Sequence, residues 1–450
     1  MSSDWPLVSV DDIKANRPSS IAIGPFGSRM KSDCYVSEGV RVVRGTNLTG
    51  GRSVSGDFVF ITPEKADELT SANLLPNDLV FPHRGAIGEV GIVPNDGERY
   101  VLSSSLMKLT CSASRAHPDF IYYFFKSEAG RFELLKNASQ VGTPGIGQPL
   151  ASLKQIKLRL PPVDVQRSIS AALRALDDRI ALLRETNATL EAIAQALFKS
   201  WFVDFDPVRA KQQGLAPAGM DEATAALFPG SFEESALGPV PKGWSVQPVG
   251  NAVECVGGAT PDTKDPSYWS PEEHAWTTPK DLSGLPAPVL LSTERRLSTR
   301  GLAKIGSGLL PVGTLLMSSR APIGYLAITQ VPVAINQGYI AMLPGSLLPP
   351  LYMLFWCQQN MEGIKARANG STFMEISKKA FRPIPALVPS SPVIDAFLAV
   401  ASPLFSRLVS NEQQTQTLAT LRDTLLPRLI SGQLRLPLAQ EAIAEAPYAD

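Results

Sequence analysis

Polar side chains in predicted turns are the residues of this chain that could carry a function, because they recur at matching places in its two halves. Arginine suits the O6 and N7 atoms of guanine, and asparagine or glutamine suits adenine, so such side chains on loops can contact base edges or phosphates. For any one of them an ordinary surface role is at least as good an interpretation. The residues are Arg29, Lys31, Arg44, Asn47, Arg84, Ser139 and Gln140 in the first half, and Lys264, Thr278, Lys280, Arg320, Asn369, Ser371 and Thr372 in the second.

The sequence patterns of an active site are missing. No G-x-x-x-x-G-K-[ST] loop is present to hold a triphosphate, and Gly306-Ser-Gly308 is followed by Pro311 where a dinucleotide fingerprint needs its third glycine. No Asn-Pro-Pro-aromatic or Asp-Pro-Pro-aromatic tetrad, with which an amino-methyltransferase holds its target amine, occurs. Glu64 and Asp67 beside Lys65 are better interpreted as an exposed charged turn than as a nuclease site. We therefore expect no catalytic residue.

A metal site or a disulfide framework is not expected either. The cysteines are far apart and form no C-x-x-C pair, and the few histidines suit surface or packing positions better than roles as ligands or general bases. These residues are Cys34, Cys111, Cys255 and Cys357, with His83, His117 and His274.

The stretch from Val165 to Trp201 has a heptad pattern, and the long helix that it predicts must position the domains that carry the polar residues. Its apolar residues fall on alternating steps of four and three, which predicts one continuous helix with a seam for a partner helix. At 1.5 Å per residue the helix is about 55 Å long, too long for a single small domain to cover. The seam comprises Ile169, Leu173, Leu176, Ile180, Leu183, Asn187, Leu190, Ala194 and Leu197.

The stretch from Phe397 to Leu429 repeats the pattern and supplies the partner helix. Leu173 corresponds to Ala401 and Leu197 to Leu425, each 228 residues later (401 − 173 and 425 − 197). Each seam has an asparagine near its middle, a residue type that specifies register at a cost in stability. Two amphipathic helices packed on separate domains are the alternative, but the shared offset favours a paired coiled coil. The second seam comprises Ala401, Leu404, Leu408, Asn411, Thr415, Leu418 and Leu425.

The remainder of each half predicts a β-rich domain. Short apolar bursts separated by Gly, Asn, Asp and Pro indicate strands, and Phe120 to Leu135 is the clearest helix before the long one. The offset between the halves falls from 239 (244 − 5) to 228 (384 − 156), so the domains differ by insertions whereas the helices do not. The matched positions are Trp5 with Trp244, Leu75-Pro76 with Leu310-Pro311, Arg84 with Arg320, Ile87-Gly88 with Ile323-Gly324, and Ile156 with Ile384.

The expected fold class is α+β, with two β-rich α/β domains joined by two long helices that pack as an antiparallel coiled coil, and with a pseudo-two-fold internal repeat. Antiparallel pairing would place the two domains at opposite ends of the helices, which suits a bipartite target. At about 3.4 Å per base pair, the helix length bounds the separation of two DNA half-sites at roughly 16 base pairs. The predicted divisions are 1–160 for the first globular domain, 161–235 for the central helical region and linker, 236–390 for the second globular domain, 391–436 for the C-terminal helical region, and 437–450 for a tail.

Composition narrows the class of protein. The chain has 450 residues, of which 44% are hydrophobic and 19% charged, so it can bury several cores. Its formal net charge of zero weakly disfavours a generic polyanion binder. The N-terminus has no basic region followed by an apolar core, and no apolar run reaches about 18 residues. We expect a soluble, cytoplasmic protein that makes no membrane contact.

Five stretches along essentially the whole chain resemble the specificity subunits of type I restriction-modification systems. Gly257-Gly-Ala-Thr-Pro261, Tyr268-Trp269 and Trp276-Thr-Thr-Pro-Lys-Asp-Leu282 are similar to one class of target recognition domain in that family, and Gly24-Pro-Phe-Gly-Ser28 with Lys31 and Arg44-Gly-Thr-Asn-Leu48 to another. The stretches 197–207 and 425–432 resemble the ends of its two conserved helical regions, and 238–244 the usual start of the second recognition domain. The chain departs from the family pattern at Ala259, where Thr is usual, and at 270–275, where a glycine-bearing turn is common.

The resemblance implies a non-catalytic subunit that reads double-stranded DNA. Each recognition domain would read one half of a bipartite site, while the helical regions set the spacer and dock two modification subunits that methylate adenine. Restriction subunits, which act as ATP-dependent translocases and nucleases, would join the assembly. S-adenosylmethionine, ATP and magnesium are therefore expected on partner subunits, with no cofactor on this chain.

Two other classes of protein stay open on the residues alone. One is a coiled-coil scaffold whose globular ends bind proteins rather than DNA, and the other is a self-sufficient nuclease or methyltransferase. Site-specific methylation by the chain co-purified with a methyltransferase would exclude the scaffold, and S-adenosylmethionine binding by this chain alone would favour the enzyme. Base choice depends on loop positions and on DNA shape, which spacing in one sequence does not specify.

Overall fold

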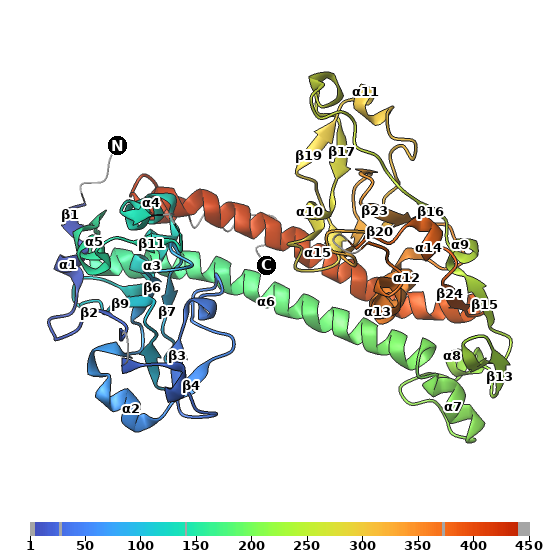
Figure 1. Ribbon diagram of the computed structural model, residues 1–450, viewed down its shortest axis with the longest axis horizontal. Helices are drawn as coiled ribbons and strands as arrows, with labels where there is room; N and C mark the ends of the chain where they lie inside the picture. Colours follow the sequence, from blue (N-terminus) through green and yellow to red (C-terminus); the bar gives the residue numbers. More distant parts are fainter. Residues whose placement is uncertain (1–4, 27–28, 140–141, 371–373, 440–450) are drawn as a thin grey trace. The chain divides into compact units, whose positions relative to one another are not determined.

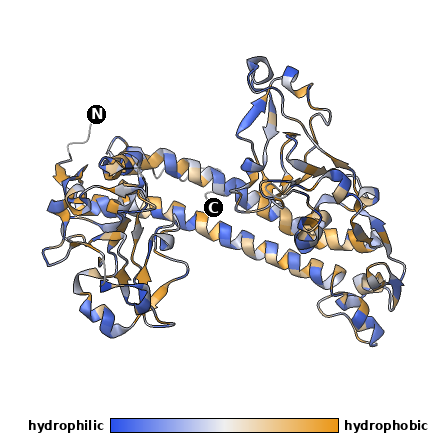
Figure 2. Ribbon diagram, in the orientation of Figure 1, coloured by the Kyte–Doolittle hydropathy of each residue, from blue (hydrophilic) through white to orange (hydrophobic). Residues whose placement is uncertain are grey.

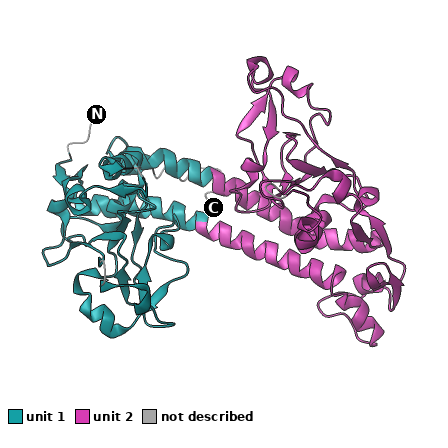
Figure 3. Ribbon diagram, in the orientation of Figure 1, with its two compact units in different colours: residues 1–180, 417–450 teal, residues 181–416 magenta. Residues whose placement is uncertain are grey.

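The computed structural model divides the chain into two compact units, residues 1–180 with 417–450 (unit 1) and residues 181–416 (unit 2) (Figure 3). It describes residues 5–26, 29–139, 142–370 and 374–439, and Figure 1 labels many of their elements. Both unit boundaries fall within long helices, so each unit combines a globular part with a portion of each helix. The predicted divisions instead kept each helix within one segment.

Unit 1 contains two four-stranded sheets, an antiparallel one in the order β2-β9-β6-β7 and a mixed one in the order β4-β3-β8-β5, in which β3 and β8 are parallel. Val42, Ile61 and Val101 are fully buried in the core of the mixed sheet, so the apolar bursts form strands that each bury a face. The strands are β1 (Leu7–Ser9), β2 (Ile21–Ile23), β3 (Val40–Val43), β4 (Val59–Ile61), β5 (Asn73–Leu74), β6 (Leu79–Pro82), β7 (Gly91–Ile92), β8 (Tyr100–Leu102), β9 (Leu106–Leu109), β10 (Ala138–Ser139), β11 (Gly145–Ile146) and β12 (Lys157–Arg159). The helices before the long one are α1 (Val10–Ile13), η2 (Ser32–Cys34), η3 (Gly45–Asn47), α2 (Pro63–Glu68), η4 (Thr70–Ala72), α3 (Pro118–Lys126), α4 (Glu128–Leu135) and α5 (Pro149–Gln155).

Unit 2 repeats this plan, with one sheet in the order β16-β23-β20-β21-β18 and another in the order β19-β17-β22. A segment with its own short helices and a hairpin comes first: α7 (Asp206–Gln212), α8 (Glu222–Ala226), β13 (Phe232–Ser235) and β14 (Gly238–Pro241). The other strands are β15 (Ser245–Pro248), β16 (Cys255–Val256), β17 (His274–Thr277), β18 (Val289–Leu290), β19 (Arg295–Leu297), β20 (Leu315–Ser318), β21 (Leu326–Thr329), β22 (Ala334–Ile335), β23 (Tyr339–Met342) and β24 (Pro385–Val388). The other helices are α9 (Val249–Ala252), η5 (Pro266–Tyr268), α10 (Pro279–Leu282), α11 (Thr299–Leu302), α12 (Pro350–Gln359), α13 (Met361–Lys365) and α14 (Lys378–Phe381).

The internal repeat extends to strand register. The pair β6 and β9 aligns Val80 with Lys108, and the pair β20 and β23 aligns Leu316 with Ala341. In the mixed sheets, β3 is parallel to β8 and antiparallel to β4, just as β17 is parallel to β22 and antiparallel to β19. The matched strands therefore pair in the same order and direction in the two halves, as the matched sequence positions predicted. The units differ in one strand, because β18 joins the first sheet of unit 2 whereas β5 joins the second sheet of unit 1.

Two details of the sequence interpretation were wrong. Asn77 and Gly313, both with positive φ, occupy the same turn position, so Leu75 matches Pro311 and not Leu310. The predicted helix from Phe120 to Leu135 is two helices, because Ser127 adopts an extended conformation and its hydroxyl accepts a hydrogen bond from Gly130 N that begins α4.

The two long helices are α6 (Val163–Phe202) and α15 (Ser391–Ile430), and both alternate between hydrophobic and hydrophilic residues along their length (Figure 2). In unit 1, Arg422 Nη1 lies 2.8 Å from Asp177 Oδ1. Within unit 2, Asn187 contacts Asn411 at 2.8 Å, and Phe198, which is later in α6, lies with its ring centroid 5.9 Å from that of Phe397, which is earlier in α15. The packing is therefore antiparallel, as predicted. Most predicted seam residues are buried, and Leu190, Leu197 and Leu404 are half-buried; the buried set is Ile169, Leu173, Leu176, Ile180, Leu183, Asn187, Ala194, Ala401, Leu408, Asn411, Thr415, Leu418 and Leu425.

The two seam asparagines bond directly to each other. Asn411 Nδ2 donates to Asn187 Oδ1 at 2.8 Å, and Asn187 Nδ2 donates to Glu412 Oε1 at 2.7 Å. All three side chains are buried, so a shift of either helix by one turn would leave polar groups without partners. This pair sets the register of α6 against α15 within unit 2.

By length and composition, α15 is the one helix among the described residues that could cross a membrane. Core helices pass the same test, and Val393, Phe397 and Ala401 of α15 are fully buried in the core of unit 2. Packing within unit 2 therefore covers part of α15, and 28% of its apolar window is buried.

Candidate nucleic-acid interface

Loops from four parts of unit 1 meet at one end of the strands of the antiparallel sheet. The chain after β6 is bonded to the turn between β8 and β9 through His83 N and Ser105 O at 2.9 Å, and to the β10–β11 hairpin through Ile146 N and His83 O at 2.9 Å. The chain after β2 joins them, because Gly24 N donates to Leu106 O at 2.9 Å. We call this set of loops the loop edge.

Unit 2 builds the same loop edge from matched residues. Ser319 N donates to Gly338 O at 2.8 Å, and Ile376 N donates to Ser319 O at 3.0 Å, in the places of the His83 bonds. The approach of the first loop also matches, since an added Cβ would lie 1.8 Å from Ser103 O at Gly24 and 1.8 Å from Ile335 O at Gly258. Only glycine fits such a contact, which accounts for the glycines in both halves.

An arginine follows His83 and Ser319 on the loop edge of each unit. Arg84 is exposed, and its guanidinium makes no hydrogen bond or ion pair within the described part of the chain. Arg320 Nη1 lies 3.7 Å from Glu375 Oε2, a loose and exposed pair that a ligand can replace. The next residues, Gly85 and Ala321, both have positive φ, so the same tight turn presents each arginine.

The hairpin residues predicted to face a ligand lie beside these arginines. Ser139 is paired with Gly145, which is bridged in turn to Arg84, and Asn369 is bridged to Glu375, the partner of Arg320. The structure thus brings together residues that are about 50 positions apart in each half. Gln140, Ser371 and Thr372, which were predicted on matched glycine-bearing loops, lie outside the described residues.

Two predicted residues of the turn after β3 have local structural roles. Asn47 is fully buried: its Oδ1 accepts from Arg44 N at 2.9 Å, and its Nδ2 donates to the carbonyl oxygens of Ser55 and Asp57, both at 3.0 Å. Asn47 cannot meet a base edge without leaving these bonds. Arg44 is half-buried, and its Nη2 lies 3.4 Å from Asp57 O.

The equivalent turn of unit 2 is built in the same way. Asp281 takes the place of Asn47, with its Oδ2 accepting from Thr278 N at 2.8 Å, and Lys280 pairs with Glu294 at 2.8 Å. Thr278 and Asp281 thus cap α10. Among the other predicted residues, Arg29, Lys31 and Lys264 are exposed on the loops that follow β2 and β16.

Sequence reasoning missed a polar pair on the loop edge of unit 2. Thr260 Oγ1 donates to Gln337 Oε1 at 2.6 Å, and both residues are exposed. The bond orients the Gln337 amide and leaves its Nε2 hydrogens for a ligand. Gln337 lies in the short turn between β22 and β23. An alignment of this turn with residues 103–105 of the first half would have identified Gln337 from the sequence.

The same place in unit 1 is less polar. Phe26 is 58% exposed, and its ring centroid lies 6.2 Å from that of His83. Burial lowers the pKa of His83, although the contact of its Nε2 with Ser104 O at 3.0 Å opposes this shift. An aromatic ring and an arginine are therefore presented where unit 2 presents an amide and an arginine.

Comparisons with known proteins agree on one family. The family model described as "Type I restriction modification DNA specificity domain" matches residues 35–192 and 241–394. The chain is 27% identical over 390 residues to the HindI specificity subunit of Haemophilus influenzae, across 77% of this chain and 84% of that protein. It is 33% identical over 185 residues to the MjaIX specificity subunit of Methanocaldococcus jannaschii, across 41% of this chain and 42% of that protein.

A solved structure shares the fold. The type I restriction-modification S subunit from M. genitalium superposes with a TM-score of 0.56 at 15% identity, and the match covers 95% of this chain and 96% of that one. At that identity the likeness concerns the fold alone.

Proposed function

Because the chain belongs to the family of type I restriction-modification DNA specificity domains, we propose that it selects the DNA sequence for a type I restriction-modification complex. The observation that carries this proposal is the loop edge, which is built twice from matched residues and presents an arginine in each unit. A protein with two divergent copies of one binding edge suits a DNA site with two different halves.

Each loop edge reads one half-site through side-chain donors. Arg84 and Arg320 suit the O6 and N7 acceptors of guanine, and the Gln337 amide offers its Nε2 hydrogens to a base acceptor such as O6, N7 or O4. Asn369 and Ser139 on the adjacent hairpins add shorter contacts, and Arg29, Lys31 and Lys264 meet phosphates. The turn residues Asn47 and Thr278 hold the neighbouring backbone in place and act on DNA only through it.

The remaining chemistry of the complex belongs to partner subunits. We propose that two modification subunits dock on the helical regions and that restriction subunits complete the assembly. The assembled complex would act on DNA in the cytoplasm. Among the described residues no group of three or more His, Cys, Asp or Glu side chains could hold a metal ion. We propose, from the family alone, that S-adenosylmethionine, ATP and magnesium bind to these partner subunits.

A domain exchange tests the proposal. Residues 1–155 are replaced by those of another family member, the chimaera is co-expressed with the modification subunits, and methylated adenines are mapped across the genome. We expect one half-site of the methylated sequence to change while the other persists. An unchanged methylated sequence, or no site-specific methylation by the wild-type complex, would contradict the proposal and favour a protein-binding scaffold.

A heptad insertion tests whether the helices set the spacer. Because α6 and α15 are paired, seven residues are added to both, between Leu183 and Asn187 and at the partner level between Asn411 and Thr415. Seven residues lengthen a helix by about 10 Å, which corresponds to roughly three base pairs, so the unread spacer should lengthen while both half-sites stay the same. The control adds the heptad to α6 alone, so that the Asn187–Asn411 contact and the Asp177–Arg422 contact can no longer both form, and this variant should fail to assemble.

A further inference from the structure

Unit 2 contains a group of cations held against aromatic rings, which we call the cation–aromatic corner. The Arg295 guanidinium carbon lies 3.5 Å from the centroid of the Trp269 ring. The Arg300 guanidinium carbon and Lys304 Nζ both lie 5.6 Å from the centroid of the Tyr268 ring. These contacts orient the charged groups, because an aromatic face attracts a cation without neutralising it.

The charges of the corner are not matched by carboxylates. Arg295, Arg300 and Lys304 form no ion pair with any residue that the structure describes. The nearest acid to Tyr268 in sequence is Asp265, whose pKa is held below its usual value first by hydrogen bonds from Ser267 and, to a smaller extent, by the charges of Arg300 and Lys304. From residue 295 to residue 361 the sequence has no Asp or Glu. The three cations therefore have no ion-pair partner among the described residues, and the carboxylate recorded at α11 is that of Glu273, whose Oε2 accepts from Thr299 N at 2.8 Å.

The equivalent helix of unit 1 has the opposite charge. Thr62 and Ser298 both cap helices that directly follow the matched strands β4 and β19, so the offset here is 236 (298 − 62). At this offset Arg300 occupies the position of Glu64, and Lys304 that of Glu68.

The charges of that helix in unit 1 are largely paired. Lys65 lies 2.7 Å from Glu68, and Arg99 lies 2.7 Å from Asp67. A helix that is basic in one copy of the repeat and acidic in the other is not required by the shared fold. The difference therefore points to a ligand that contacts this helix in unit 2 only.

We propose that the cation–aromatic corner binds the phosphate backbone of DNA next to the half-site read by unit 2, and that unit 1 makes no equivalent contact. The inference rests on the proposed function. The chain after Gly258 carries Thr260, which is bonded to Gln337 on the loop edge, and Ala259 O accepts from Trp276 Nε1 at 3.3 Å. The Trp276 ring centroid lies 5.2 Å from the Arg295 guanidinium carbon, so the corner adjoins the loop edge. Arg295 and Arg300 supply planar donors that suit phosphate oxygens, and Lys304 supplies a point charge.

The test measures the salt dependence of DNA binding by the chain assembled with its modification subunits. The variant is Arg300→Gln with Lys304→Gln, and the matched control is Lys65→Gln with Arg99→Gln, which removes the paired cations at the corresponding helix of unit 1. Each phosphate contact contributes about 0.9 to the slope of log affinity against log salt, so the variant should lose about 1.8. Over a fourfold rise in salt, its affinity should then fall about 12-fold less than that of the wild type.

Affinity at low salt should decrease equally for cognate and unrelated duplexes, and the methylated sequence should not change, because phosphates carry no sequence information. The control should retain the wild-type slope. An unchanged slope in the variant, an equal loss in the control, or an altered methylated sequence would each overturn the inference. These outcomes are separate from failure of the proposed function, in which the wild-type complex would show no sequence preference at all.

Discussion

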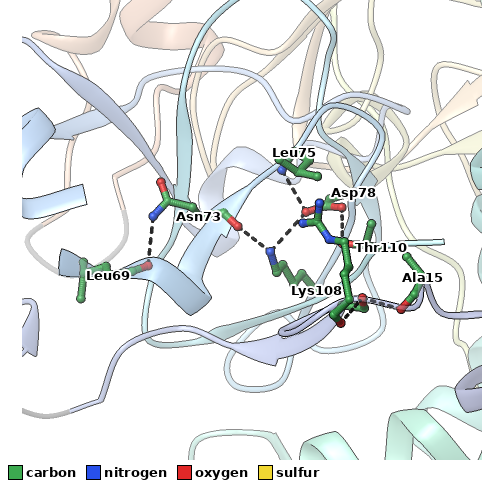
Figure 4. Close-up of polar contacts among 9 residues, drawn as sticks. Ala15, Leu69, Asn73, Leu75, Asp78, Lys108 and Thr110 are labelled. Carbon is green, nitrogen blue, oxygen red and sulfur yellow. Dashed lines mark hydrogen bonds and ion pairs between the residues drawn. The ribbon is translucent and has the colours of Figure 1, made fainter. Parts of the chain in front are cut away.

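A buried ion pair in unit 1 provides the sharpest test of how the fold is stabilised (Figure 4). Asp78 is fully buried and Lys108 is 1% exposed, with Lys108 Nζ 3.5 Å from Asp78 Oδ2 and 2.5 Å from Asn73 O. The carboxylate also accepts from Leu75 N at 2.9 Å and from Thr110 Oγ1 at 2.6 Å. Burial raises the pKa of Asp78 although the charge of Lys108 opposes this, and burial lowers the pKa of Lys108.

In unit 2, uncharged residues occupy the positions of the ion pair. Thr314 and Ala341 stand at the positions of Asp78 and Lys108, and both are fully buried. Pro311 has no N–H to be satisfied, and the Thr314 hydroxyl donates to Pro311 O at 2.7 Å. The fold therefore does not need the ion pair, and its contribution to stability depends on both partners being present.

We expect Lys108→Met alone to destabilise unit 1 by about 3–5 kcal/mol, because it leaves a buried carboxylate without its counter-charge. Asp78→Asn combined with Lys108→Met should recover all but about 1–2 kcal/mol. The asparagine keeps an acceptor for Leu75 N and can donate to Thr110, so the remaining loss is chiefly the partner of Asn73 O.

The deficit of the single variant should depend on pH. The folded-state pKa of Asp78 is already raised, and removal of Lys108 raises it further. A group with a raised folded pKa stabilises the fold below its unfolded pKa, and this contribution is lost as pH rises through the folded value. Lys108→Met should therefore be least destabilising in acid and most destabilising at neutral pH, whereas the double variant should show no such trend.

Hydrogen exchange measures this within one chain. A loss of 3–5 kcal/mol should speed exchange in β6 and β9 by about 150- to 5,000-fold, at 1.36 kcal/mol per tenfold. Strands β20 and β23 of unit 2 are the internal control and should not change. Exchange within about tenfold of wild type in Lys108→Met, or a double variant no better than the single one, would refute the reasoning.

Three other outcomes are expected. Arg84→Ala and Arg320→Ala should each relax the methylated sequence at one position of a different half-site, with a loss of about 1–3 kcal/mol in binding; relaxation of the same half-site by both would contradict the assignment. Gln337→Ala should relax only the half-site that Arg320 affects, and genome-wide methylation mapping compares the two patterns directly. Asn187→Leu should lower the melting temperature more than Asn411→Leu, by the equivalent of about 1–3 kcal/mol, because Asn187 is bonded both to Asn411 and to a buried glutamate; equal melting temperatures would count against that network.

The sequence by itself determined the repeat, the two long helices and the family. Heptad spacing and a constant offset such as that between Leu173 and Ala401 are properties of order along the chain, and helical periodicity converts them directly into a seam. The arginines at positions 84 and 320 were matched in the same way. The seam residues and the matched arginines could be located in the sequence because helix formation and the repeat depend on residues that are close together in the chain.

Only the tertiary structure decided which residues meet. Strand pairing brings Arg84 beside Gly145, places Thr260 against Gln337, and sets Arg295 over Trp269, and none of these contacts follows from local spacing. The structure likewise shows Asn47 as a buried cap rather than an exposed side chain, since its environment comes from residues that follow it in a separate turn. Contacts between distant residues depend on the register in which whole elements pack, and register is a property of the folded chain.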